Sequence, residues 1–154
     1  MTVKTLHTTI AIAASPEDVW AVLADLDHYP SWNPFIPRIA GTLAKGERLA
    51  VRLAPPGGGG MTFRPTVLAA TPGRELRWLG RLLVRGLFDG EHRFALEPLG
   101  AGRVRFVQEE RFTGLLVPLF ARSLGGPTRA GFQAMNRALK ERAEAPAPVA
   151  LAAD

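Results

Sequence analysis

Cysteine is absent from this sequence of 154 residues, which excludes disulfides, thiolate metal sites and cysteine nucleophiles. Histidine is scarce, and His7, His28 and His92 do not have the spacing of metal ligands. The glycine run 57–60 is not followed by the Lys-Ser/Thr pair of a phosphate-binding loop. We therefore expect neither a metal nor another cofactor, and any chemistry must come from the remaining side chains.

Long apolar runs are also missing. The first ten residues, MTVKTLHTTI, lack the apolar core of a signal peptide, and no run is long enough to span a bilayer. We therefore expect a cytoplasmic protein. The length and the hydrophobic fraction of 47% are typical of one globular domain with a real core. We predict a single domain over residues 1–145 and a loose tail over 146–154.

Positive charge is in excess, with a formal net charge of +5 carried mainly by arginine. Such a balance can serve nucleic acid, anionic lipid or an acidic ligand. Here the arginines are dispersed among acids, which favours an ordinary arginine-rich surface. Exposed aromatic residues do not alternate with them, so no nucleic-acid partner is expected. The oligomeric state stays open.

The order of predicted elements is one strand, two short helices, about six strands and a long helix. The first helix has a capping Ser15 and Pro16 at its first position, and the second must end before Pro34. Strands are predicted at 5–13, 36–41, 47–53, 61–70, 74–81, 87–97 and 103–112, and helices at 16–25, 27–33 and 127–144. No helix separates the later strands, so an antiparallel sheet and an α+β fold are expected.

The helix at 127–144 is the element around which the rest is built. Phe132, Met135 and Leu139 recur at helical spacing and form one apolar stripe. Gly131 beside that stripe costs about 1 kcal/mol relative to alanine, which calls for a reason. Close packing of another chain segment is favoured over room for a ligand.

Six stretches resemble the START-like (SRPBCC) superfamily, within it the polyketide cyclase/dehydrase and lipid-transport group. They are SPEDVW (15–20), YPSWNPF (29–35), PGRELRW (72–78), FDGEHRFAL (88–96), VRFVQEERFTG (104–114) and GFQAMNRALKERAE (131–144). The resemblance implies a helix-grip fold, in which a curved antiparallel sheet of about six to seven strands wraps around the C-terminal helix. It also implies a cavity for a small hydrophobic or amphipathic molecule, such as a lipid, sterol-like or polyketide-like compound.

Apolar and aromatic side chains in phase with the core are the predicted lining of that cavity. They are Trp32, Phe35, Trp78, Phe88, Phe112, Phe132 and Met135. Simple core packing is the competing interpretation for each of them, and it is the one that we adopt for Trp20.

Three polar residues, His92, Gln108 and Glu110, share the inward phase of their strands. If the turn spans 98–102, His92 faces Gln108 and reaches Glu110 diagonally, within hydrogen-bond distance. The three side chains could satisfy one another, anchor a ligand hydroxyl or carbonyl, or make His92 and Glu110 an acid/base pair. Polar lining is favoured over catalysis, so a ligand-binding protein is preferred to a cyclase/dehydratase-type enzyme.

Two loop segments, 82–87 and 115–124, are unusually apolar and lie beside Arg81, Arg85 and Arg122. They are predicted to be neighbours at one end of the central hairpin. They could cap the core as a fixed lid, form a mobile gate, or make a transient contact with a membrane or partner.

Overall fold

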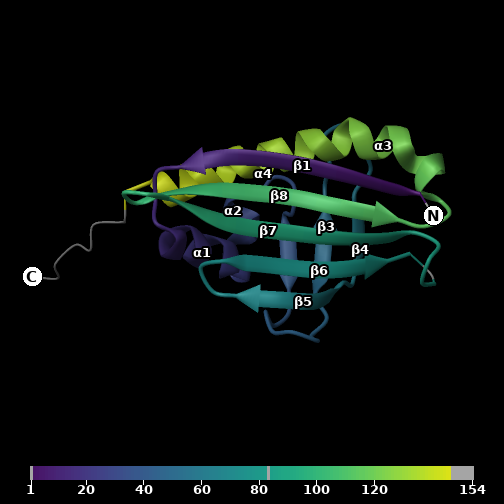
Figure 1. Ribbon diagram of the computed structural model, residues 1–154, viewed down its shortest axis with the longest axis horizontal. Helices are drawn as coiled ribbons and strands as arrows, with labels where there is room; N and C mark the ends of the chain where they lie inside the picture. The colour runs from purple at the N-terminus through teal and green to yellow at the C-terminus, as the bar shows by residue number, and fades with distance from the viewer. Residues whose placement is uncertain (1, 83, 147–154) are drawn as a thin grey trace, which may run out of the picture.

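The computed structural model describes residues 2–82 and 84–146, which form two antiparallel sheets and a long helix (Figure 1). The elements are β1 (Val3–Ile12), α1 (Pro16–Ala24), η1 (Leu26–His28), α2 (Tyr29–Trp32), β2 (Arg38–Ala40), β3 (Ala50–Leu53), β4 (Met61–Phe63), β5 (Thr66–Thr71), β6 (Glu75–Arg81), β7 (Asp89–Gly100), β8 (Arg103–Thr113), η2 (Val117–Phe120), α3 (Ala121–Gly125) and α4 (Pro127–Glu144). The predicted α+β helix-grip fold is confirmed. Leu83 of the predicted apolar loop and 147–154 of the predicted tail lie outside the described residues.

The large sheet has the strand order β1-β8-β7-β6-β5, and the small sheet has the order β2-β3-β4. The expected strand at 61–70 is divided into β4 and β5, because Pro65 has no N–H for the ladder. The strand count is therefore eight among the described residues, rather than six or seven. The amide of Leu49 donates to Pro65 O, and a bridge pairs Arg48 with Thr66, so the small sheet continues from the edge of the large one.

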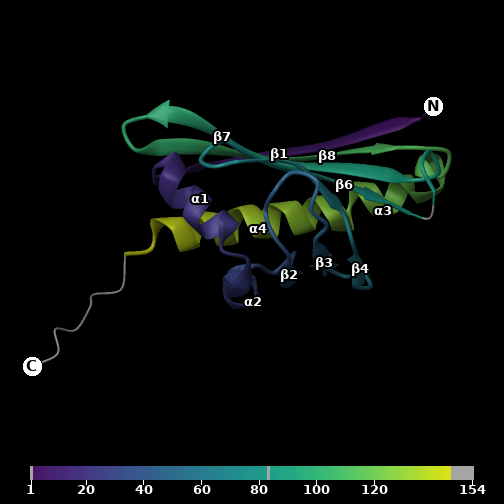
Figure 2. The ribbon, with the colours of Figure 1, turned by 90° about the horizontal axis from the view of Figure 1, so that it is seen from below.

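The long helix α4 lies against one face of the large sheet and packs on β1 and β8, with the small sheet on the same side (Figures 1 and 2). Phe132, Met135 and Leu139 are fully buried, which confirms the predicted stripe. A Cβ at Gly131 would lie 2.3 Å from the Phe35 ring. The small residue thus allows Phe35 to pack directly on the helix backbone, and close packing is the correct explanation of Gly131.

Local signals fix the short helices near the N-terminus. The Ser15 side chain accepts a hydrogen bond from the Asp18 amide at 3.1 Å and caps α1. The helical turn before Pro34 ends at Asn33, whose ψ of 107° is extended. The Asn33 carboxamide oxygen then accepts from the Phe35 and Ile36 amides, at 3.0 and 2.8 Å. This turn holds the Phe35 backbone where its side chain meets α4.

The register of the β7–β8 hairpin differs from the predicted one by two residues. The connection is only Ala101 and Gly102, which have φ values of 50° and 69°, and a bulge between Pro98 and Gly100 precedes it. Phe94 therefore lies opposite Gln108, and His92 lies opposite Glu110. The predicted five-residue turn was too long. Both strands nevertheless keep the predicted inward faces, because a register shift of two residues leaves each side chain on the same face of the sheet.

The outer face of the large sheet carries ladders of ion pairs. Arg93 bridges Glu75 and Glu109 at 2.8 and 2.9 Å, and His7 lies 3.0 Å from Glu109. Burial alone would raise the pKa of Glu109, but the hydrogen bonds from His7 and Arg93 lower it below its ordinary value.

Among the described residues, no helix is both long enough and apolar enough to cross a membrane.

Candidate functional site

Five polar side chains form one hydrogen-bonded chain between the large sheet and α4: Thr8 (β1), His92 (β7), Gln108 and Glu110 (β8), and Asn136 (α4). His92 Nδ1 lies 3.1 Å from Glu110 Oε2, and His92 Nε2 lies 3.1 Å from Gln108 Oε1. The Gln108 amide donates to Asn136 Oδ1 at 2.7 Å, and the Asn136 amide donates to Thr8 Oγ1 at 3.0 Å. The Thr8 hydroxyl donates to the Gln108 carbonyl at 3.1 Å, which closes the chain on itself. The four members other than Glu110 are buried and satisfied.

The orientation of Gln108 follows from a backbone carbonyl. The Gln108 Nε2 atom donates to Phe132 O at 3.3 Å, and a carbonyl can only accept. Gln108 Oε1 must therefore face His92, so His92 Nε2 carries a proton and donates it. The side-chain network thereby fixes one nitrogen of the imidazole as a donor.

The other nitrogen of His92 shares a single proton with Glu110. Two arrangements satisfy the 3.1 Å contact, an imidazolium with a carboxylate or a neutral imidazole with a carboxylic acid. The Glu110 side chain is 14% exposed, against 4% for His92, so Glu110 is the member closer to solvent. The pair can therefore hold one proton and exchange it at the carboxyl group.

A glycine makes room for the Glu110 carboxylate. A Cβ on Gly90 would lie 2.7 Å from Glu110 Oε1, so the carboxylate occupies the space that a larger residue would fill. Gly80 lies opposite Gly90 on the next strand, and a Cβ there would lie 3.1 Å from the Phe63 ring, which covers it. No hydrogen bond to Glu110 Oε1 comes from the described residues, which leaves this oxygen as the open end of the chain.

Aromatic rings pack closely around His92. Its ring centroid lies 4.4 Å from Phe94, 5.1 Å from Phe132 and 5.3 Å from Trp78. Phe35 packs on Phe132 at 5.5 Å. The structure thus brings Trp78, Phe132 and the polar trio together, with Phe35 one contact further out.

A second aromatic group runs towards the end of the sheet. Phe88 is half-buried and lies between Phe112 at 5.7 Å and Phe120 at 5.4 Å.

Trp32 is apart from both groups, since it packs on Tyr29 at 5.1 Å. Burial, and then the charge of Asp25, raise the pKa of the Tyr29 phenol, which donates to Leu23 O at 2.6 Å. Met135 is fully buried in the core cluster.

Two indole N–H groups in the predicted lining have no partner among the described residues. They are Nε1 of Trp32 and Nε1 of Trp78, and both atoms are buried. An unpaired buried donor costs about 1–3 kcal/mol, so each one requires an explanation.

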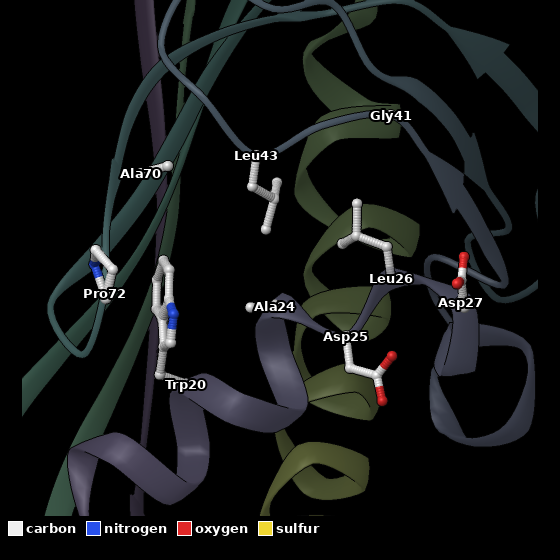
Figure 3. Close-up of a pocket in the computed structure, with 9 residues that line it drawn as sticks. All are labelled: Trp20, Ala24, Asp25, Leu26, Asp27, Gly41, Leu43, Ala70 and Pro72. Carbon is white, nitrogen blue, oxygen red and sulfur yellow. The ribbon is translucent and has the colours of Figure 1, made fainter.

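Two hollows of the surface lie elsewhere. One of about 420 Å³ lies between Trp20, the α1–η1 junction and the β5–β6 turn (Figure 3). Another of about 560 Å³ lies between the start of α1 and the ends of β6 and β7. None of the predicted ligand-binding residues lines either hollow. Trp20, assigned to the core, is only half-buried and forms a wall of the first.

Sequence reasoning missed two members of the polar chain, Asn136 and Thr8. Asn136 lies on the buried stripe of α4, four residues after Phe132. A polar residue at an apolar helical position is the signal that would have found it. Thr8 shares a face of β1 with the buried Leu6 and Ile12, but only the structure reveals that it closes the chain.

The comparisons with known proteins agree with this architecture. A family described as polyketide cyclase / dehydrase and lipid transport matches residues 4–144. The chain belongs to this family. The predicted resemblance to START-like proteins of the cyclase/dehydrase and lipid-transport group is therefore confirmed. No match was found among the curated proteins.

Three solved structures illustrate the similarity. An aromatase/cyclase from a Streptomyces species is 20% identical, with a TM-score of 0.71 over 93% of this chain and 94% of that one. Norcoclaurine synthase from Thalictrum flavum is 16% identical, with a TM-score of 0.70 over 92% and 94%. A START superfamily protein from Mycobacterium smegmatis is 23% identical, with a TM-score of 0.69 over 91% and 97%. These identities show the fold that the family shares and not its activity.

Proposed function

We propose that the protein binds a small apolar or amphipathic molecule between the large sheet and α4, and that Glu110 meets its polar group. The observation that carries this proposal is the open end of the buried polar chain. Glu110 has one oxygen on His92, which aromatic rings surround, and the other without a hydrogen bond from the described residues. Such a carboxylate selects a hydrogen-bond donor, so the molecule should carry a hydroxyl or amine.

The ligand enters from the end of the sheet where Phe88 lies. Trp78, Phe132 and Met135 are at most 1% exposed, so no path from solvent leads past them. Exposure increases towards Glu110 and Phe88, both of which are half-buried. Displacement of Phe88 from Phe112 is therefore the shortest way to open a path to Glu110.

Two further observations support a bound molecule of this class. The unpartnered N–H of Trp78 lies on the ring beside His92 and would gain an acceptor from the ligand. The norcoclaurine synthase of the same fold was crystallised with dopamine and hydroxybenzaldehyde, which are small aromatic molecules. The two sequences are only 15% identical, so this likeness supports the size of the proposed ligand but does not indicate which molecule it is.

Binding is tested with a fluorescent naphthol, an apolar ring with one hydroxyl donor. The expected dissociation constant is about micromolar, or about −8 kcal/mol. Glu110→Gln should weaken it about tenfold, because a charged acceptor contributes about 1.5–3 kcal/mol to a hydrogen bond. Glu97→Gln, on the exposed outer face, is the matched control and should leave binding unchanged. Absence of binding, or equal effects of both variants, rejects the proposal.

The second candidate function is a cyclase/dehydratase-type reaction, favoured by the 3.1 Å contact between His92 and Glu110. In it Glu110 delivers or removes the proton at the ligand, and His92 replenishes it. Native mass spectrometry of protein from its own host should identify a molecule that co-purifies. If the protein is an enzyme, Glu110→Gln should still bind that molecule while its conversion stops. Unchanged conversion by Glu110→Gln and by His92→Gln excludes this role for the pair.

A further inference from the structure

The two apolar loop segments meet at one end of the large sheet. The Leu115 and Leu116 amides donate to the carbonyls of Gly86 and Leu87, at 3.1 and 2.9 Å. The predicted neighbourhood of the β6–β7 loop and the segment after β8 is therefore correct. Figure 1 shows this end beside the N-terminus and α3, opposite the β7–β8 turn. We call Leu82, Val84, Leu115, Leu119 and Phe120 the apolar tip.

The side chains of Leu115 and Leu119 face outwards although their neighbours are anchored in the core. Leu115 is 77% exposed and Leu119 is 75% exposed, while Val117 between them is 1% exposed and Leu124 is 8% exposed. The interpretation of these segments as a cap on the core thus fits Val117 and Leu124, and Phe120 of the apolar tip also packs on Phe88. Five large apolar residues exposed together at one end of a molecule indicate a contact surface.

The charge around the apolar tip has one sign. Arg81, Arg85 and Arg122 are exposed beside it. Asp89 is the nearby acid, but it is largely buried, where it accepts from the Gly86 amide at 3.1 Å and lies 3.8 Å from Arg81. The sequence has no Asp or Glu between residues 111 and 140. The surface that covers this end should therefore be both apolar and negatively charged.

We propose that the apolar tip docks on an anionic lipid surface, with its leucines in the headgroup region and Arg81, Arg85 and Arg122 against the lipid charge. A second copy of the chain would bring the same arginines together, and their repulsion disfavours it. The proposal rests on the exposed loops and stands independently of any ligand within the fold.

Vesicle flotation of the full chain tests the proposal. Vesicles of phosphatidylcholine with about 30% phosphatidylglycerol should bind the protein, and phosphatidylcholine alone should bind it at least tenfold more weakly. Raising the salt from about 0.1 to about 1 M shortens the Debye length from about 10 to about 3 Å and should release most of the bound protein.

Matched variants locate the contact. Leu119→Asp should lower vesicle affinity at least tenfold, because it removes an inserted leucine and adds a charge of the wrong sign. Leu99→Asp changes an exposed leucine at the opposite end of the β7–β8 hairpin and should have no effect. Arg122→Gln should lower affinity about fivefold, since each basic residue near an anionic surface contributes about 1 kcal/mol, whereas Arg103→Gln beside the far turn should not.

Three outcomes overturn the proposal. The first is absence of binding to the anionic vesicles by a folded protein. The second is an equal loss from Leu119→Asp and Leu99→Asp. The third is a dimer in solution that Leu119→Asp converts to a monomer, which would make the apolar tip an interface between two copies. All the substituted side chains are exposed, so the variants should fold, and circular dichroism verifies this.

Discussion

Gly131→Ala is the substitution that best tests how tightly the interior is filled. The new Cβ would lie 2.3 and 2.5 Å from two carbons of the Phe35 ring. Ordinary carbon contacts are about 3.5–4.0 Å, so the ring would have to move by more than about 1 Å. Phe35 is 2% exposed and packs edge-on against Phe132, and its amide is held by Asn33. Little freedom remains for that movement.

The expected change in stability of Gly131→Ala is the difference between two opposing effects. Alanine is about 1 kcal/mol better than glycine inside a helix, which stabilises the variant. Overpacking of a filled core typically costs about 1–3 kcal/mol, and the short contact with a fixed ring places Gly131 at the upper end. The net loss is therefore about 2 kcal/mol, equivalent to a decrease in Tm of about 4–8 °C for a chain of this length.

Urea unfolding of the wild type and four variants measures this loss: Gly131→Ala, Gly126→Ala, Phe35→Leu and the Phe35→Leu/Gly131→Ala double variant. Gly126→Ala is the matched control, because no atom lies within 4 Å of its Cβ position and its φ of −90° suits any residue. It should be neutral or slightly stabilising. Phe35→Leu in the Gly131→Ala background should relieve the overlap, so the double variant should lose at least about 1 kcal/mol less than the sum of the single losses.

One result would refute the reasoning. If Gly131→Ala gains the full helix propensity of about 1 kcal/mol, the Phe35 ring is not held against α4. The space beneath Phe35 could then open without cost, and the interpretation of Gly131 as room for a ligand would replace close packing. The experiment therefore also measures how easily the interior could admit a molecule.

Two further predictions concern pH and motion. Because the folded pKa of Glu109 is lowered, its stabilisation is present above its unfolded pKa of about 4.3 and is lost as the pH falls through the folded value. Glu109→Gln should thus be less stable than wild type in urea at about pH 6 and equal to it at about pH 2, and a gap that persists in acid contradicts this. If the loops form a gate, the amides of 84–87 and 115–124 should exchange faster than the central strands and slow down with a ligand or anionic vesicles. Equal protection with and without these additions means a fixed lid.

Elements with strong local signals could be predicted from the sequence. The helix α4 has the predicted bounds because Pro127 begins it and its apolar stripe has one period. The inward faces of β7 and β8 were correct because alternation depends on period alone. The predicted register of the hairpin was wrong. A bulge and a two-residue connection with positive φ at Ala101 are backbone features that composition does not specify.

The site was predictable only in part, for a physical reason. His92, Gln108 and Glu110 stood out as polar residues among inward phenylalanines, and they do meet. The partners on β1 and α4 required tertiary placement, since Thr8 and Asn136 are 128 residues apart in the chain. The structure packs Trp32 on Tyr29, apart from the other predicted lining residues, and a ligand contact of Trp32 stays a prediction.

The polar chain has a structural role that does not explain all of its members. It joins α4 to β1 through Asn136 and Thr8, and to β8 through Gln108, and every donor in that part has a partner. A purely structural chain could end at Gln108, with an apolar residue in the place of His92. Instead it continues through His92 to an ionisable carboxylate, placed over Gly90, where any larger residue would displace it. Glu110 is half-buried and is paired through one oxygen only, so its other oxygen can take a second partner. Packing thus accounts for Thr8, Gln108 and Asn136, and the proposed ligand contact would account for the continuation of the chain through His92 to Glu110.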